Sequence, residues 1–239
     1  MSTINLDHLT KTVYSKDELE EMAEAINAKF FPERLNKAMP FDPYLFLDKL
    51  GYEYQWALIS PGLQISAMTL FSDSYWYIWS KSSYERGDKP KIKDFKKKTV
   101  LINERFLNLK KTHYSEMFAV AHEGCHIIKD RHYFEEHSSE VASIYRANDS
   151  KRIYWKGNEP TVELIERQND YLTAAVIMPK EQIKTEFFKA LRWKTIPNEP
   201  IEFEPYMKRG IAALVKLYDI GFNVVKYRLQ DINVLIESK

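Results

Sequence analysis

The sequence is poor in cysteine and carries almost no net charge, and each absence excludes a class of protein. Its 239 residues include one cysteine, Cys125, so an internal disulfide is impossible and a reducing compartment fits. The formal net charge is +1, a balance that predicts neither nucleic-acid nor membrane binding. No apolar run approaches the ~20 residues of a membrane span, and the N-terminal segment lacks the apolar centre of a signal peptide. We therefore expect a soluble, cytoplasmic protein.

The residues that are present predict a folded chain of the α+β class. The composition is 44% hydrophobic and 29% charged, as in ordinary globular proteins. A helix is expected after Ser15, which forms a capping-box pattern with Glu18. Residues 52–105 are rich in strand-forming side chains. From about residue 114 onward the pattern is helical, with a helix–turn–helix around Gly221.

Two polar connections are expected between these elements. The lysine-rich segment 86–98 is predicted to be a solvated connector and not a nucleic-acid surface, because it is short and its only aromatic residue is Phe95. A polar loop is predicted around residues 147–160.

The stretch AVAHEGCHIIKDRHYF contains the pattern H-E-x-x-H, formed by His122, Glu123 and His126. Residues four apart share one face of a helix, so both imidazoles can reach one metal ion. A zinc ion lowers the pKa of its bound water to ~7, and Glu123 is placed to take a proton from that water and pass it to a leaving amine. The motif therefore predicts zinc-dependent hydrolysis.

His132 is one candidate for the third protein ligand. It occupies the last position of the longer pattern H-E-x-x-H-x-x-G-x-x-H, in which the glycine breaks the helix so that the third histidine can turn back. Lys129 stands in place of that glycine. If the helix continues, His132 lies about 240° round and ~9 Å along the axis from His126, out of reach of the metal.

Glu166, on a later predicted helix, is the other candidate. Asp170 lies one helical turn further along the same face. Its carboxylate could accept a hydrogen bond from the far ring nitrogen of a ligand histidine and so fix the tautomer of that ring. A surface carboxylate on an amphipathic helix explains Glu166 equally well, so the spacing leaves the third ligand open.

Together, NERF…FAVAHEGCH and ERQNDYLTAAVIMP resemble the ImmA/IrrE family of zinc metallopeptidases. His122, Glu123 and His126 match the family's first motif, and Glu166 matches the glutamate of its second. The resemblance covers residues 40–235, including the helical tail. It implies a zincin-like fold in which Glu166 is the third zinc ligand and Glu123 the catalytic base.

Four positions depart from the family pattern, and one of them, Leu172 in place of a phenylalanine, does not touch the proposed chemistry. Asp170 replaces an asparagine, which keeps a hydrogen-bond acceptor and adds charge, and it remains the candidate that orients a ligand histidine. Cys125 replaces the glycine usual before the second histidine, and we expect a small buried helix residue there. Asn169 replaces an alanine away from the proposed chemistry.

The resemblance also implies domains and a substrate. It divides the chain into an N-terminal helical extension (1–35), a metallopeptidase domain with a small sheet (36–195) and a C-terminal helical subdomain (196–239). Family members are similar to proteases that cut a helix-turn-helix repressor and so release gene expression. We expect the substrate to pair with an exposed sheet edge in the strand at 98–106.

The alternative is a regulator without protease activity, which docks a repressor or binds DNA. On that view Glu123 is dispensable. The second helix after Gly221 carries only Lys226 and Arg228 as cations, few for phosphate contacts, so we expect no direct nucleic-acid binding.

Overall fold

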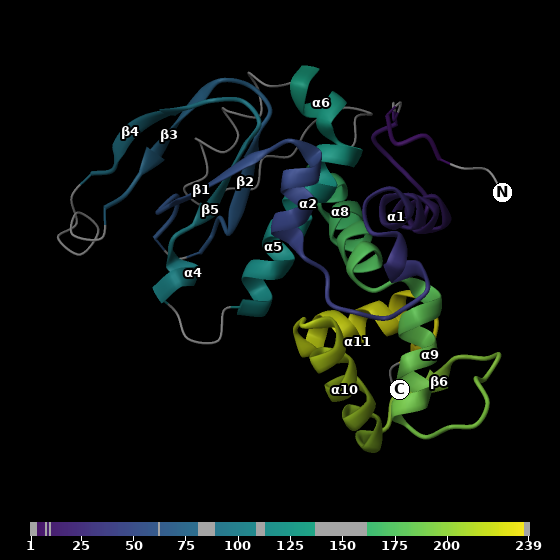
Figure 1. The fold of residues 1–239 in the computed structure, drawn as a ribbon. Helices are drawn as coiled ribbons and strands as arrows, with labels where there is room; N and C mark the ends of the chain where they lie inside the picture. The colour runs from purple at the N-terminus through teal and green to yellow at the C-terminus, as the bar shows by residue number, and fades with distance from the viewer. Residues whose placement is uncertain are drawn as a thin grey trace. The chain divides into compact units, whose positions relative to one another are not determined.

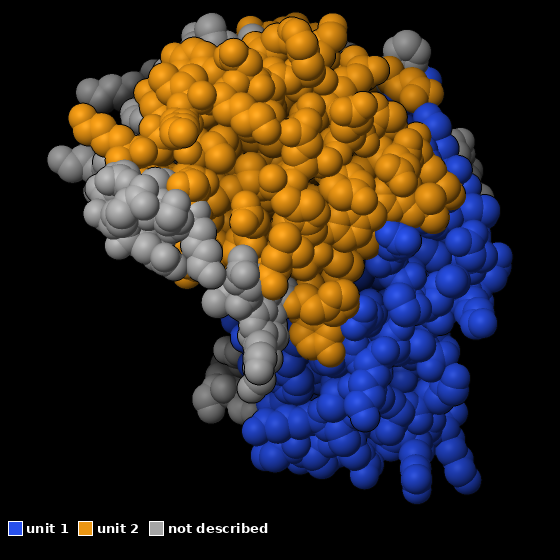
Figure 2. Space-filling view, turned by 60° about the vertical axis from the view of Figure 1, so that its left-hand side comes forward, with its two compact units in different colours: residues 1–6, 14–42, 170–239 blue, residues 7–13, 43–169 orange. Residues whose placement is uncertain are grey.

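The computed structural model describes residues 4–7, 9, 11–61, 63–80, 89–108, 113–136 and 162–236, and these form a mixed α+β protein as predicted (Figure 1). The polar loop expected at 147–160 lies outside the described residues. None of the described helices is long and apolar enough to cross a membrane. The chain divides into two compact units, unit 1 (1–6, 14–42, 170–239) and unit 2 (7–13, 43–169), coloured in Figure 2.

Unit 2 is built on a three-stranded sheet of β1 (Glu53–Ala57), β5 (Thr99–Asn103) and β2 (Ala67–Leu70), in the order β1-β5-β2. Strand β5 runs parallel to β1 and antiparallel to β2. Every residue of β5 is buried, including the polar Thr99 and Asn103 at its two ends. The prediction that this strand offers an exposed edge to a substrate is therefore wrong, because β5 lies between β1 and β2, which are the outer strands of this sheet among the described residues.

A second, two-stranded sheet pairs β3 (Ser74–Ile78) with β4 (Lys91–Phe95) as an antiparallel ribbon. The lysine-rich segment expected as a connector thus contributes a strand. Trp76 and Phe95 are buried, while Tyr75 and Tyr77 on the other face are more than one-third exposed. The ammonium of Lys93 lies 4.9 Å from the centre of the Phe95 ring, so this lysine covers an aromatic side chain of its own strand.

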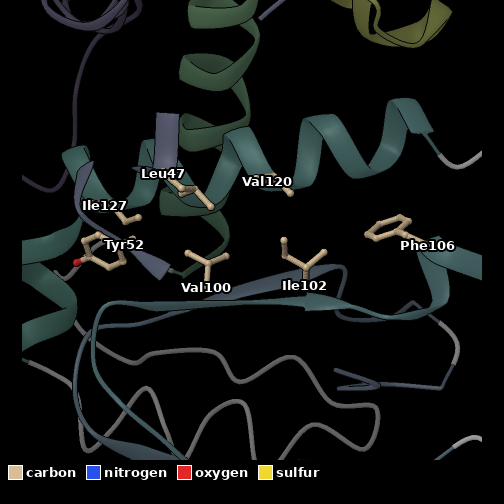
Figure 3. Close-up of a cluster of buried hydrophobic side chains, with 7 residues drawn as sticks. All are labelled: Leu47, Tyr52, Val100, Ile102, Phe106, Val120 and Ile127. Atoms are coloured by element: carbon tan, nitrogen blue, oxygen red, sulfur yellow. The ribbon is translucent and has the colours of Figure 1, made fainter. Parts of the chain in front are cut away.

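Helices α5 (His113–Lys129) and α2 (Pro43–Leu50) cover one face of the three-stranded sheet (Figure 3). Their apolar side chains meet the sheet in a buried cluster formed by Leu47, Tyr52, Val100, Ile102, Phe106, Val120 and Ile127. The intervening residue of β5, Leu101, points to the opposite face and packs with Trp76 and Phe95. Successive side chains of β5 thus point to opposite faces of the sheet, and those of Val100 and Ile102 pack against the helices.

Gly124 allows α2 to come very close to α5. A Cβ atom at this position would lie 2.5 Å from Cδ1 of Phe46, which is fully buried on α2. Short helices α4 (Arg105–Asn108) and α6 (Arg131–Glu136) complete the described part of unit 2, together with the first half of α8 (Val162–Ile177).

Unit 1 combines the two ends of the chain. Its elements are the rest of α8, α1 (Lys16–Phe30), η1 (Pro32–Leu35), α9 (Lys180–Ala190), β6 (Ile201–Glu202), η2 (Pro205–Met207), α10 (Lys208–Tyr218), α11 (Phe222–Asp231) and β7 (Leu235–Ile236). The capping box at the start of α1 is confirmed, with Glu18 N donating to Ser15 Oγ and Ser15 N to Glu18 Oε2. Gly221 is the N-cap of α11, as the predicted helix–turn–helix requires. The domain boundaries expected at residues 35 and 195 stay predictions.

A buried ion pair joins the first and last helices within unit 1. Nη2 of Arg228 on α11 donates to Oε2 of Glu20 on α1 at 2.8 Å, and the Tyr171 hydroxyl donates to Oε1 of Glu20 at 2.6 Å. Burial raises the pKa of the Glu20 carboxyl, but the hydrogen bond and charge of Arg228 outweigh it and leave the pKa below its ordinary value. The carboxylate is therefore held in its charged form by the guanidinium.

Candidate metal centre

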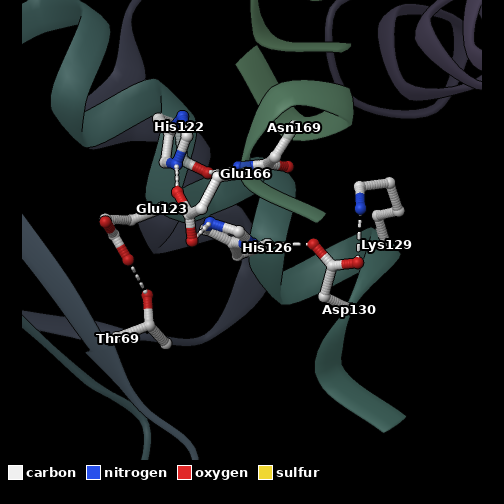
Figure 4. Close-up of polar contacts among 8 residues, drawn as sticks. All are labelled: Thr69, His122, Glu123, His126, Lys129, Asp130, Glu166 and Asn169. Carbon is white, nitrogen blue, oxygen red and sulfur yellow. Dashed lines mark hydrogen bonds and ion pairs between the residues drawn. The ribbon is translucent and has the colours of Figure 1, made fainter. Parts of the chain in front are cut away.

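His122 and His126 lie one turn apart on α5, on the side of the helix away from the sheet cluster. Val120, Ala121 and Ile127 bury the opposite side. The two ring centroids are 4.6 Å apart with an interplanar angle of 78°, so the rings meet edge to face and are not stacked (Figure 4).

Glu166 on α8 joins the two histidines. Its Oε2 lies 3.1 Å from Nε2 of His122 and its Oε1 lies 3.3 Å from Nε2 of His126. One ligand atom from each residue falls within 4.8 Å of the other two, which makes this a group that could hold a metal ion. Asn169, one turn further on α8, donates from Nδ2 to the backbone oxygen of His122 at 2.8 Å and fastens α8 to α5 at this point.

The donor set fits zinc. Two imidazole nitrogens and one carboxylate are a ligand combination of catalytic zinc sites, and three protein ligands leave a coordination position for water. Ligand atoms of a tetrahedral zinc ion with bonds of about 2.0–2.2 Å lie roughly 3.3–3.6 Å apart. The distances of 3.1 and 3.3 Å between the histidine nitrogens and the Glu166 oxygens are close to that spacing.

His132 lies outside this group. It is on α6, its side chain is 57% exposed, and its Nδ1 is 3.4 Å from Oε1 of Glu136. The turn that would bring it back does not form: Lys129 is not among the described residues with positive φ, and Asp130 N donates to His126 O at 2.9 Å as in a continuous helix. The structure thus brings Glu166, and not His132, to the two motif histidines.

His126 and Glu166 each stabilise the charged form of the other. Burial lowers the pKa of the His126 imidazole, but Glu166 and the hydrogen bond to Asp130 outweigh it and raise the pKa to about 10. Burial likewise raises the pKa of Glu166, and the positive charge of His126 with the bonds to both rings brings it well below its usual range. A metal ion held by this group would compete with the proton on the His126 imidazole, so its affinity would fall as the pH is lowered.

Glu123 is buried beside the ligands and is held from the sheet. It is 8% exposed, and the hydroxyl of Thr69 on β2 donates to its Oε2 at 2.8 Å (Figure 4). The bond fixes one carboxylate oxygen and leaves the other for a different partner. Thr69 was not anticipated from the sequence, because no local pattern links it to a residue 54 positions away.

Asp130 holds the far nitrogen of His126. Its Oδ2 lies 2.7 Å from Nδ1 of the ring, and its Oδ1 binds the ammonium of Lys129. Neither residue was anticipated, although the spacing of four from His126 to Asp130 follows the same rule that singled out Asp170 after Glu166. Asp170 is exposed on α8, and its expected part in orienting a ligand histidine stays a prediction.

Cys125 is a fully buried residue of α5, in agreement with the small packing residue that the sequence predicts.

Comparisons with protein-family models and with curated proteins find no match for this chain.

Proposed function

We propose that this protein is a zinc-dependent metalloendopeptidase with a zincin-like fold, which cleaves a helix-turn-helix transcriptional repressor and so relieves repression. The convergence of His122, His126 and Glu166 from two helices, with the buried carboxylate of Glu123 on the same helix as the histidines, carries the proposal. The choice of a repressor as substrate rests on the resemblance of the two motifs to the ImmA/IrrE family. The single buried cysteine suits action in the cytoplasm.

Each residue of the site has a role in this reaction. His122, His126 and Glu166 would hold zinc, which lowers the pKa of a bound water towards ~7 and polarises a carbonyl. Glu123 takes a proton from the attacking water and returns it to the leaving amine nitrogen. Thr69 keeps the Glu123 carboxylate turned in one direction, so that its second oxygen is the one that exchanges the proton.

Strand β2 replaces β5 as the place where we expect a substrate segment to pair. Among the described strands β2 has β5 as its one neighbour, so its other edge faces away from the sheet. Thr69 lies in the middle of this strand and contacts Glu123. An extended peptide added to that edge would therefore pass the catalytic carboxylate.

The test is cleavage by the wild type and by Glu123→Gln, each loaded with zinc, of a helix-turn-helix repressor encoded beside the gene. Intact-mass spectrometry should show two fragments with the wild type and none with Glu123→Gln, while both bind one zinc ion. A Glu123→Gln protein that relieves repression as well as the wild type would instead establish a docking module without proteolysis.

One observation weighs against DNA binding by the helix–turn–helix. Of the two cations on α11, Arg228 is 1% exposed and its guanidinium binds Glu20. The ammonium of the other, Lys226, lies 5.2 Å from the centre of the Phe203 ring. Lys226 is itself partly buried, and a helix with one such cation offers little to a phosphate backbone.

A further inference from the structure

Lys129 is a charged residue enclosed in the protein next to the candidate metal centre. It is 2% exposed and its neighbour Asp130 is 1% exposed. Burying an ammonium or a carboxylate is costly unless the charge is paired. The pair formed by Lys129 Nζ and Asp130 Oδ1 meets that requirement for both residues.

The carboxylate of Asp130 links this ammonium to a proposed metal ligand. With Oδ1 taken by Lys129, Oδ2 accepts from Nδ1 of His126 at 2.7 Å (Figure 4). A histidine that carries its proton on Nδ1 presents an unprotonated Nε2, and this is the atom that faces Glu166. The ammonium of Lys129 thus contacts the carboxylate of Asp130, which contacts the imidazole of His126, whose Nε2 faces the candidate metal position.

The contact of the His126 ring with phenylalanine does not select one nitrogen. The ring meets Phe134 edge-on, with centroids 5.6 Å apart and an interplanar angle of 80°, and Phe134 stacks on Phe71 at 5.2 Å. These apolar contacts limit the plane of the ring. They do not distinguish the ring from one turned by half a rotation, whereas the hydrogen bond to Asp130 does.

Asp130 follows the last residue of α5, where the helix dipole is negative and disfavours a carboxylate. A cation at Lys129 offsets that repulsion. We propose that Lys129 is a positioning residue of the metal centre, which acts through Asp130 to hold His126 with Nε2 directed at the bound metal. The inference rests on the proposed metallopeptidase function, because it assigns the residue to the zinc site of that enzyme.

The experiment measures zinc affinity by competition with a chromophoric chelator, beside the thermal unfolding of the zinc-free protein. Lys129→Met leaves the Asp130 carboxylate buried without its ammonium, so Lys129→Met/Asp130→Asn, which removes both charges, is measured as well. Asp130→Asn completes the cycle. Ile127→Val, on the same helix but within the sheet cluster, is the control for a loss of packing alone.

We expect each folded variant of the pair to bind zinc about 10–100-fold more weakly than the wild type. Because Lys129 acts through Asp130, Lys129→Met should add no further loss in the Asp130→Asn background. Ile127→Val should lower the unfolding temperature and leave zinc affinity unchanged. The absorption bands of the cobalt-substituted protein should shift in the Lys129 and Asp130 variants only.

Unchanged zinc affinity in a folded Lys129→Met protein overturns the inference. A Lys129→Met/Asp130→Asn protein whose loss of affinity equals the sum of the two single losses overturns the route through Asp130. These results leave the proposed peptidase intact, since the wild type still binds zinc and Glu123→Gln still tests cleavage. A wild type that binds no zinc overturns both proposals together.

Discussion

Gly124→Ala tests the close approach of α2 to the helix that carries the metal ligands. The added Cβ would lie 2.5 Å from Cδ1 and 2.6 Å from Cε1 of Phe46. Non-bonded carbon atoms are normally ~3.5–4.0 Å apart, so the ring or the helix has to move by about 1 Å. Phe46 is 0% exposed, and its ring is confined by the surrounding core.

Two effects of opposite sign set the magnitude. Alanine favours a helix interior over glycine by about 1 kcal/mol. Overpacking a tight core costs about 1–3 kcal/mol, and a clash with two ring atoms belongs at the upper end. We therefore expect Gly124→Ala to lower the free energy of unfolding by about 1–2 kcal/mol.

Urea unfolding of the wild type, Gly124→Ala, Phe46→Leu and the double variant measures this. Phe46→Leu removes the ring that the new methyl group would strike, so the double variant should lose less stability than the two single losses added together. Gly124→Ala as stable as the wild type, or strictly additive losses, would refute the steric explanation and show that helix propensity decides.

Two further predictions concern the metal ligands and the buried ion pair. After dialysis against a weak chelator, elemental analysis should find about one zinc ion in the wild type and in His132→Ala but none in Glu166→Ala; zinc retained by Glu166→Ala would remove that residue from the ligand set. The folded-state pKa of Glu20 is depressed, so its contribution to stability is present above its unfolded pKa of about 4.3 and is lost as the pH falls through the folded value. In urea titrations at pH 7, Glu20→Gln should therefore have a lower free energy of unfolding than the wild type. The loss should be near the lower end of about 3–5 kcal/mol because Glu20 keeps some exposure, and it should shrink below about pH 4. A loss that is the same at every pH would contradict the assignment.

Local patterns were sufficient for the capped first helix and for two of the three residues of the candidate metal centre. The capping box at Ser15 is decided by neighbours in the chain, and His122 and His126 share a face because a helix repeats every 3.6 residues. Glu166 comes from another helix, 40 residues after His126, so its arrival at the two histidines depends on how α8 packs on α5. Spacing could nominate it but could not choose between it and His132.

The errors concerned features that pairing between distant segments decides. The strand in residues 98–106 was expected at an edge because it precedes the motif helix, although consecutive apolar residues such as those at 100–102 are typical of a strand covered on both faces. Residues 91–95 were predicted to lie in a connector because the segment is rich in lysine, whereas their strand conformation depends on pairing with β3. Thr69 has no sequence signal at all, since it reaches Glu123 only through the packing of β2 against α5.

The pairing of Glu20 with Arg228 affects how the protein is made. The two residues are 208 positions apart, so at ~5–20 residues per second the ribosome needs roughly 10–40 s to supply the guanidinium after the carboxylate. Throughout that time Glu20 on α1 lacks the cation that it pairs with in the folded protein, where Met22 and Ile26 of the same helix are fully buried. A nascent chain therefore exposes the apolar side chains of α1 for most of its synthesis, and we expect chaperones to bind this segment.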